Sequence, residues 1–226
     1  MLDWFPENIA SYGEEMDSLI RFIYYLVGAW FVLVEVLFIY FILASKKKKN
    51  QKAAYHRGHT WFQLKWVLIP VMLVFVLDLV IEGKGHHVWH HIKQELPTPG
   101  IVVNITAKQF DWDFDLPGVD NKMGTDDDLK EIASVLHVPV NTVVQFNLGA
   151  KDVMHSFWVP VLRLKQDAIP GRIIKGWFKA TKAGTYPIAC AEICGVGHTK
   201  MMGVLKVYEK EAYQKWVSEQ STEEEW

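Results

Sequence analysis

Five side chains in the last third of the chain belong to types that bind soft metal ions. Cys190 and Cys194 are followed within one short segment by His198 and Met201, and His155 stands upstream in the stretch DVMHSFWVP. Two thiolates, two imidazoles and one thioether form a mixed ligand set that suits copper. A zinc site of cysteine and histidine would not need the methionine. This pattern therefore predicts a copper site.

The same two cysteines allow another interpretation. They are the only cysteines among 226 residues, so a disulfide in an oxidising compartment is the alternative. A disulfide gives no reason for two histidines and a methionine to lie close to the pair in sequence. Metal binding explains all five residues together.

The segment CAEICGVGHTKM, residues 190–201, resembles the dinuclear copper loop of cytochrome c oxidase subunit II. In that family two thiolates bridge two copper ions, one histidine and one methionine complete the first copper, and one histidine and one backbone carbonyl complete the second. The resemblance implies the following ligands, in that order: Cys190 and Cys194; His155 and Met201; His198 and the carbonyl of Glu192. It also implies that the Glu192 side chain reaches a magnesium ion at the boundary with the catalytic subunit.

The resemblance covers most of the chain. It includes LRLKQDAIPGR, residues 162–172, which in the family faces the catalytic subunit, and two N-terminal membrane spans. The implied function is to accept electrons from a c-type cytochrome at the copper pair and to pass them to haem in subunit I. There they reduce oxygen, coupled to proton translocation. Because the chain has no C-x-x-C-H haem motif, we expect it to transfer electrons only, as one subunit of that enzyme.

Three other classes of protein share parts of this pattern. A membrane-anchored protein with a single copper would use Cys194, His198 and Met201 and leave Cys190 idle. Quinol oxidases have a similar outer domain without the copper ligands, and nitrous oxide reductase is a soluble protein with a large catalytic domain. A net charge of -2 and an apolar content of 50% argue against a nucleic-acid partner.

Two apolar stretches near the N-terminus predict membrane-spanning helices. Residues 22–44 contain one charge, Glu35, and about 20 apolar residues are enough to cross a bilayer. The second stretch, 66–81, reaches sufficient length if the helix starts at Trp61, and Pro70 would bend it without abolishing it. The segment between the spans is basic, and its cations are Lys46, Lys47, Lys48, Lys49, Lys52, Arg57 and Lys65.

This basic segment sets the expected topology. The positive-inside rule places it in the cytoplasm or its organellar equivalent, so both termini and the copper loop lie outside. We expect an outer N-terminal segment at 1–21, a helical hairpin at 22–81 with its inner loop at 45–60, a linker at 82–99 and a copper domain at 100–226. The location is then a respiratory membrane, plasma or inner, with lipid around the hairpin and the copper domain on the outer, periplasmic side.

Several polar residues of the membrane part have open roles. Glu35 and Asp78 lie within the spans, where a hydrogen bond at a subunit interface is favoured over a place in a proton path. Gln63 stands where the family usually has the glutamate at the mouth of a proton channel, so either another residue serves as the entrance or this channel is built differently. The histidines after the second span could bind metal at i, i+4 spacing, but a solvated helix end accounts for them better. They are His86, His87, His90 and His91.

From about residue 100 the pattern becomes that of a β domain. Apolar and acidic residues alternate in FDWDFD, and short apolar runs follow, separated by Gly, Pro and Asn. The expected fold is a two-helix transmembrane hairpin followed by a cupredoxin-like β-sandwich or barrel. DDDLKEIASV could form a short helix beginning near Asp126, and 209–226 a weak amphipathic helix. The strand runs are IVVNITA, VVQFNLG, SFWVPV, IIKGWFKA, TYPIAC and GVLKVYE.

The point of electron uptake departs from the family pattern. The family usually has a tryptophan where this chain has Phe110, and Trp112 could take over its role as the docking point. The alternative is that Phe110, Trp112 and Phe114 form the buried stripe of a strand. Neighbouring aspartates would steer a basic c-type cytochrome, in a geometry unlike that of the usual soluble donor and compatible with a supercomplex. Asp152 is either a support for His155 or a turn residue that caps its own backbone.

Overall fold

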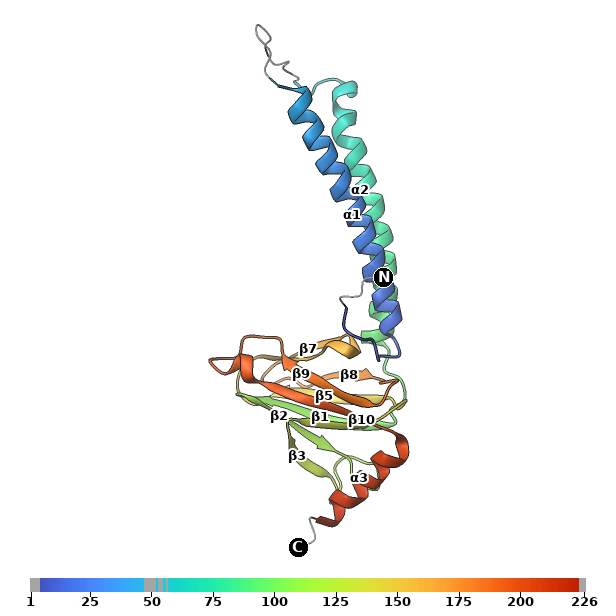
Figure 1. The fold of residues 1–226 in the computed structure, drawn as a ribbon, viewed down its shortest axis with the longest axis vertical. Coiled ribbons are helices and arrows are strands. Elements are labelled where there is room, and N and C mark those ends of the chain that lie inside the picture. The colour runs from blue at the N-terminus through green and yellow to red at the C-terminus, as the bar shows by residue number, and fades with distance from the viewer. Residues whose placement is uncertain (1–4, 47–51, 53–54, 56, 224–226) are drawn as a thin grey trace. The chain divides into compact units, whose positions relative to one another are not determined.

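The computed structural model describes residues 5–46, 52, 55 and 57–223 and divides the chain into two compact units (Figure 1). One unit is helical and spans Glu15–His91. The other joins Met1–Glu14 to Ile92–Trp226 and consists mainly of strands. Three lysines of the predicted basic loop, Lys47 to Lys49, lie outside the described residues.

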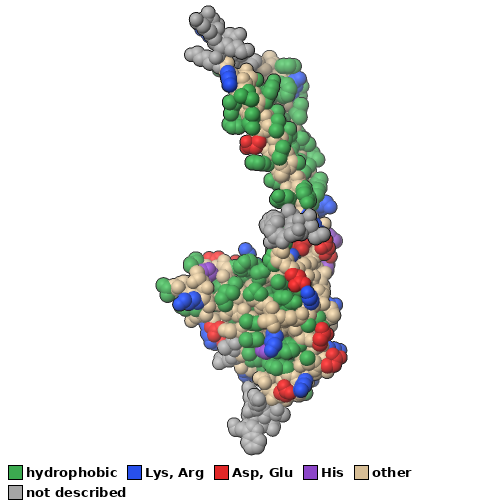
Figure 2. Space-filling model, viewed as in Figure 1, with side chains coloured by type: hydrophobic (Ala, Val, Ile, Leu, Met, Phe, Trp, Pro, Cys, Tyr) green, Lys and Arg blue, Asp and Glu red, His purple; other side chains and the backbone are tan. Residues whose placement is uncertain are grey.

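The helical unit contains two long apolar helices, as predicted. They are α1 (Gly13–Ala44) and α2 (Trp61–Trp89), and a π turn at His90–Gln94 continues α2. Each is long and apolar enough to cross a membrane, with windows of mean hydropathy 2.5 and 2.4 in which no residue is buried. Figure 2 shows hydrophobic side chains over much of the surface of these helices. A helix that is apolar all round needs lipid or partner helices to cover it.

The β unit is a sandwich of two five-stranded sheets. One sheet has the order β3-β2-β1-β5-β8, and the other has the order β4-β10-β9-β6-β7. The strands are β1 (Ile101–Lys108), β2 (Asp111–Leu116), β3 (Leu129–Ala133), β4 (Val135–Pro139), β5 (Val144–Ala150), β6 (His155–Val159), β7 (Leu164–Ala168), β8 (Ile174–Phe178), β9 (Gly184–Cys190) and β10 (Met202–Tyr208). The predicted combination of a helical hairpin and a β-sandwich is therefore confirmed.

The core lies between the two sheets and follows the alternation seen in the sequence. Every second residue of β1, from Ile101 to Ala107, is buried, and its parallel neighbour β5 buries Phe146 and Leu148 in the same way. Trp112 and Phe157 meet edge to face in this core, with ring centroids 5.4 Å apart. Each such side chain contributes about 1.5–3 kcal/mol by leaving water. This packing gives the strand ends that carry the candidate ligands a rigid base.

Two predictions for the segment between β2 and β5 need correction. The residues from Asp126 onward do not begin a helix, because Leu129–Ala133 form β3 and pair with β2. Leu129 is 3% exposed in that position, so burial against the sheet outweighs the helical preference of Leu, Lys and Glu. The next strand, β4, has no counterpart among the predicted runs, and neither does β7, which lies further along the chain within the segment 162–172.

The described N-terminal residues belong to the β unit. Ile9 donates its amide N–H to the carbonyl of Val161 at 2.9 Å, and Thr181 donates to the carbonyl of Ile9 at 2.8 Å. The Tyr12 ring is 1% exposed and meets Trp177 edge to face at 5.2 Å. The chain therefore leaves the β unit at α1 and returns to it after α2.

The predicted C-terminal amphipathic helix is present as α3 (Lys210–Glu223). It buries Tyr213 and Val217 and stacks Trp216 flat on His137 of β4, with ring centroids 3.9 Å apart and 3° between the planes. His137 Nδ1 lies 2.9 Å from the Tyr208 hydroxyl. Burial, and then the charge of Lys206, lower the pKa of His137 to about 4.

This histidine predicts a loss of stability in acid. Between about pH 6.5 and the folded pKa near 4, the unfolded chain binds a proton that the folded protein does not. The free energy of unfolding therefore decreases as the pH is lowered through that window. The expected loss attributable to His137 reaches about 3 kcal/mol. Urea unfolding followed by tryptophan fluorescence measures it. His137→Phe keeps a flat ring but cannot titrate, and an equal pH slope in both proteins would contradict the assignment.

Candidate metal centre

The candidate ligands come from two neighbouring strands and the loop that follows one of them. β9 ends at Cys190, and the next 11 residues return to β10 through a 3-10 turn at His198–Lys200. His155 opens β6, which pairs with β9 through Phe157 and Cys190. The Cys190 N–H donates to the Met201 carbonyl at 3.2 Å and closes the base of the loop. Residues distant in the sequence thereby meet at one end of one sheet.

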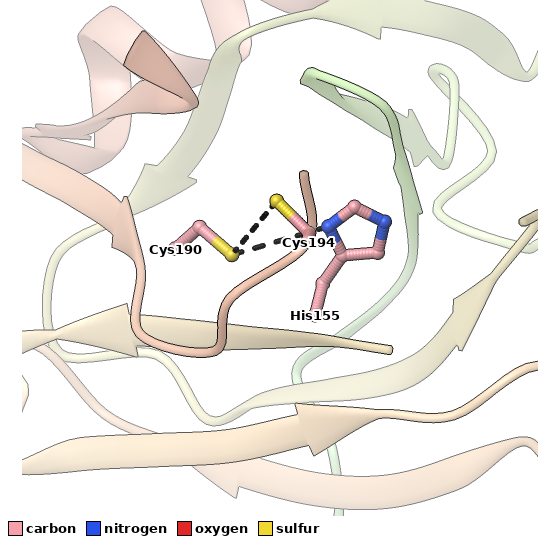
Figure 3. A group of neighbouring side chains, drawn as sticks. All are labelled: His155, Cys190 and Cys194. Carbon is pink, nitrogen blue, oxygen red and sulfur yellow. Dashed lines mark hydrogen bonds between the residues drawn. The ribbon is translucent and has the colours of Figure 1, made fainter. Parts of the chain in front are cut away.

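Three of the ligands form a buried cluster (Figure 3). The Sγ atoms of Cys190 and Cys194 lie 3.9 Å apart, and Cys190 Sγ lies 3.9 Å from His155 Nδ1. These ligand atoms all lie within 4.8 Å of one another. Among the described residues no other group of histidine, cysteine and carboxylate ligand atoms lies this close together.

The other three predicted ligands adjoin this cluster. Met201 Sδ lies 3.1 Å from His155 Nδ1 and 3.8 Å from Cys194 Sγ. His198 Nδ1 lies 3.7 Å from Cys194 Sγ. The Glu192 carbonyl oxygen lies 3.1 Å from Cys190 Sγ. The structure therefore brings all six predicted donor atoms together around the two sulfurs.

This arrangement fits a thiolate-bound metal better than a disulfide. Both cysteines are free, and their sulfurs are 3.9 Å apart, whereas a disulfide requires about 2.05 Å. An ion bonded at about 2.3 Å to both sulfurs would have an S–metal–S angle of about 116°, close to the tetrahedral value. Six donors exceed the four of a structural zinc site, and the thioether favours copper.

The protons on the thiols compete with any metal. Burial, and then the contact with Cys190, raise the pKa of the Cys194 thiol to about 11. A metal ion must displace that proton in order to bind. The buried, partly apolar setting therefore keeps the Cys194 thiol protonated when no metal is bound and favours a soft ion with a high affinity for sulfur.

Asp152 orients the imidazole of His155. Its Oδ1 atom lies 2.8 Å from His155 Nε2, which leaves Nδ1 directed at the sulfurs. Asp152 also accepts the backbone N–H groups of Val153 and Gln109, both at 2.6 Å. Burial acts to raise the pKa of Asp152, but the bonds from His155 and these amides outweigh it and lower the pKa. The two alternatives for Asp152, support for the ligand and turn capping, are both realised.

The turn between β1 and β2 packs against the copper loop, residues 190–201, and the sequence did not predict this contact. A Cβ atom on Gly197 would lie 2.5 Å from the Phe110 ring, and one on Gly195 would lie 2.9 Å from Gln109 Nε2. Gly195 also has a φ of +134°, which side chains rarely adopt. The two glycines are therefore needed for the loop to lie against this turn.

The aromatic residues proposed for electron uptake differ in how far the structure buries them. Trp112 is 0% exposed and Phe114 is likewise buried, so the buried-stripe alternative holds for both. Phe110 precedes β2 and is half-buried. A docking protein cannot touch Trp112, because the expected alternation places that ring inside the sandwich. The exposed apolar residues of the loop itself are Ile193 at 73% and Val196 at 102%.

Part of the acidic sequence is also internal. Asp113 is 3% exposed and pairs with Lys108 at 2.7 Å and Lys151 at 3.3 Å. Asp128 is 5% exposed and accepts the Gly124 N–H. The acidic surface available to a partner is therefore smaller than the count of aspartates in the sequence indicates.

Proteins similar to this chain are known both for its β unit and for almost its whole length. Residues 101–208 match the family described as cytochrome C oxidase subunit II, periplasmic domain. The alternative cytochrome c oxidase subunit 2 of Bradyrhizobium diazoefficiens is 28% identical over 240 residues, covering 97% of this chain and 85% of that protein. Cytochrome c oxidase subunit 2 of Cereibacter sphaeroides is 27% identical over 244 residues, covering 95% and 79%.

The periplasmic domain of subunit II of cytochrome oxidase from Bradyrhizobium japonicum is 30% identical, covers 57% of this chain and 99% of its own, and aligns with a TM-score of 0.48. Fold and site define a protein with two helices long and apolar enough to cross a membrane and a β-sandwich that carries a buried histidine and cysteine cluster. The chain belongs to the cytochrome c oxidase subunit II family.

Proposed function

We propose that this subunit binds a dinuclear copper centre and uses it to receive electrons from a c-type cytochrome and deliver them to haem in the catalytic subunit. The observation that carries the proposal is the convergence of four further donor atoms around two thiols whose sulfurs lie 3.9 Å apart. Two copper ions bridged by two thiolates share one electron, so their ligand geometry changes little during electron transfer. A purified copper-loaded chain should be reduced by a c-type cytochrome, and failure of that reduction would refute the proposal.

The protein's own contribution is to hold these ligands still. His155 is fixed by β6 and by Asp152, Cys190 by the end of β9, and Met201 by its carbonyl bond to Cys190. Such supporting contacts orient ligands and tune the metal. Cys190 Sγ lies beside both His155 Nδ1 and the Glu192 carbonyl oxygen. This position supports a role for Cys190 as a ligand, which a single-copper site would not give it.

The membrane placement follows from the helices and from the N-terminal segment. α1 and α2 would cross the membrane, and residues 9–12 are bound within the same unit as the copper loop, which puts both ends of the hairpin on one side. Lys46, Lys52 and Arg57 between the helices favour the inner side for that segment. The copper domain then lies outside, facing the electron donor.

Thiol labelling tests this topology. Lys52→Cys should resist an impermeant reagent in intact cells and react after the cells are opened, whereas Lys122→Cys in the loop after β2 should react in both. The two native cysteines are 8% and 4% exposed and contribute little background. Labelling at position 52 in intact cells would reverse the proposed orientation.

Two contacts with the catalytic subunit are part of the proposal. The Glu192 carboxylate is half-buried at the edge of the copper loop, where it would bind magnesium together with groups of that subunit. The segment 162–172 would face the same subunit, and it is held by a bond from Ser156 to Asp167 and one from Lys93 to Gln166, both 2.8 Å.

We propose that the electron donor docks over Phe110 and the exposed apolar tip of the copper loop, with Trp112 behind them in the core. Phe110→Ala should slow electron uptake at saturating donor by about tenfold or more, because a small misplacement of the donor is costly. Stopped-flow reduction measures the rate, with copper content checked for each protein. Val119→Ala removes an apolar side chain that is 65% exposed beside α3 and should leave the rate unchanged. Equal rates in all three proteins would place uptake elsewhere.

A further inference from the structure

Gln109 forms hydrogen bonds to both Asp152, which contacts the ligand His155, and Cys194 of the copper loop. It belongs to the turn between β1 and β2 and offers two donors. Its backbone N–H donates to Asp152 Oδ2 at 2.6 Å, and its side-chain Nε2 donates to the Cys194 carbonyl at 2.5 Å. Since 85 positions separate Gln109 from Cys194, only the fold creates this contact.

These two bonds complete a chain of contacts behind the ligands. His155 Nε2 lies 2.8 Å from Asp152 Oδ1, and the other oxygen of that carboxylate accepts from Gln109. Gln109 then bonds to the residue that carries the second thiol. The imidazole supplied by β6 and the loop segment that carries the second thiol are thus linked through two residues, Asp152 and Gln109, neither of which is a predicted ligand.

The loop has few other restraints at this point. His198 N donates to the Gly195 carbonyl at 3.1 Å, which shapes the following turn but does not link it to the strands. The Phe110 ring covers Gly197, and Gln109 Nε2 covers Gly195. Gln109 supplies the hydrogen bond and Phe110 supplies the packing that hold the loop against the β1–β2 turn.

We infer that Gln109 is a positioning residue that holds the Asp152–His155 pair and the Cys194 segment at the separation that copper requires. This inference rests on the proposed copper function. Without the Nε2–H bond, the Cys194 carbonyl is freed and the loop can drift away from His155. Loss of such an outer contact lowers metal affinity by about 10- to 100-fold in other sites.

Gln109→Met tests the inference because it keeps the length of the side chain and removes its donor. A matched control exists in Gln145 of β5, whose Nε2 donates to the Pro97 carbonyl at 2.7 Å within the same unit. Gln145→Met therefore loses a bond of the same kind away from the metal centre. Both variants should lose about 1 kcal/mol of stability, the worth of one such bond.

The decisive readout is copper affinity, measured on the full chain in detergent by competition with a copper chelator. Gln109→Met should lower the affinity about tenfold, while Gln145→Met should match the wild type. Equal affinities in all three proteins, or equal losses in both variants, would overturn the positioning role. If the wild-type chain does not bind a copper pair, the proposed function fails first and this inference falls with it.

Discussion

Replacing Cys194 with serine is expected to remove both copper ions and not only one. Its sulfur lies between the other donors, 3.9 Å from Cys190 Sγ, 3.7 Å from His198 Nδ1 and 3.8 Å from Met201 Sδ. A serine hydroxyl is a harder and far less acidic ligand, so neither ion keeps its bridging thiolate. Metal analysis of the purified full chain should show copper falling from two ions per chain to near zero.

A substitution at Met202, a neighbouring residue that is not a predicted ligand, is the control for this result. Met202 follows Met201 directly but opens β10 with its side chain 48% exposed, so Met202→Leu should retain both ions. Loss of one copper and retention of the other in Cys194→Ser would contradict a shared thiolate. That outcome would favour the single-copper alternative.

Trp112→Ala is expected to destabilise the β unit by about 3–5 kcal/mol, the range for truncating a buried large aromatic side chain. Trp112 is wholly buried, and its ring meets Phe157 at 5.4 Å and His155 at 6.2 Å. The cavity would therefore open directly behind a copper ligand. Chemical unfolding followed by circular dichroism measures the loss of stability.

Trp158 provides the matched comparison. It belongs to β6, like Phe157, but is 41% exposed, so Trp158→Ala should cost about 1 kcal/mol or less. Equal losses in the two variants would mean that Trp112 is not a core residue. Because Trp112→Ala disturbs both stability and copper, Phe110 is the better position for testing electron uptake.

The sequence predicted the elements that have a strong period or an unusual composition. The apolar helices and the alternating strands β1 and β5 were found because each element shows its burial pattern in its own residues, whereas β2 alternates in sequence but also buries Asp113. The copper-type ligands were found because five of them are rare side chains and four stand within 12 residues. The family resemblance added the Glu192 carbonyl, which no side-chain pattern can reveal.

The remaining features depend on contacts between distant residues. β3 reads locally as a helix and becomes a strand because it can pair with β2. Trp112 and Phe110 are equivalent by sequence alternation, but Phe110 lies in the turn before β2 and Trp112 lies within the strand. Gln109 carries no signal at all in the sequence, since its role is defined by Asp152 and Cys194.

Electron paramagnetic resonance of the purified, copper-loaded full chain tests the central claim most directly. If both thiols bridge two ions, one unpaired electron is shared and its hyperfine splitting spreads over two copper nuclei. The proposed site predicts this mixed-valence signal together with two copper ions per chain. A signal from a single copper nucleus, or a full-occupancy zinc site with no signal, would contradict it.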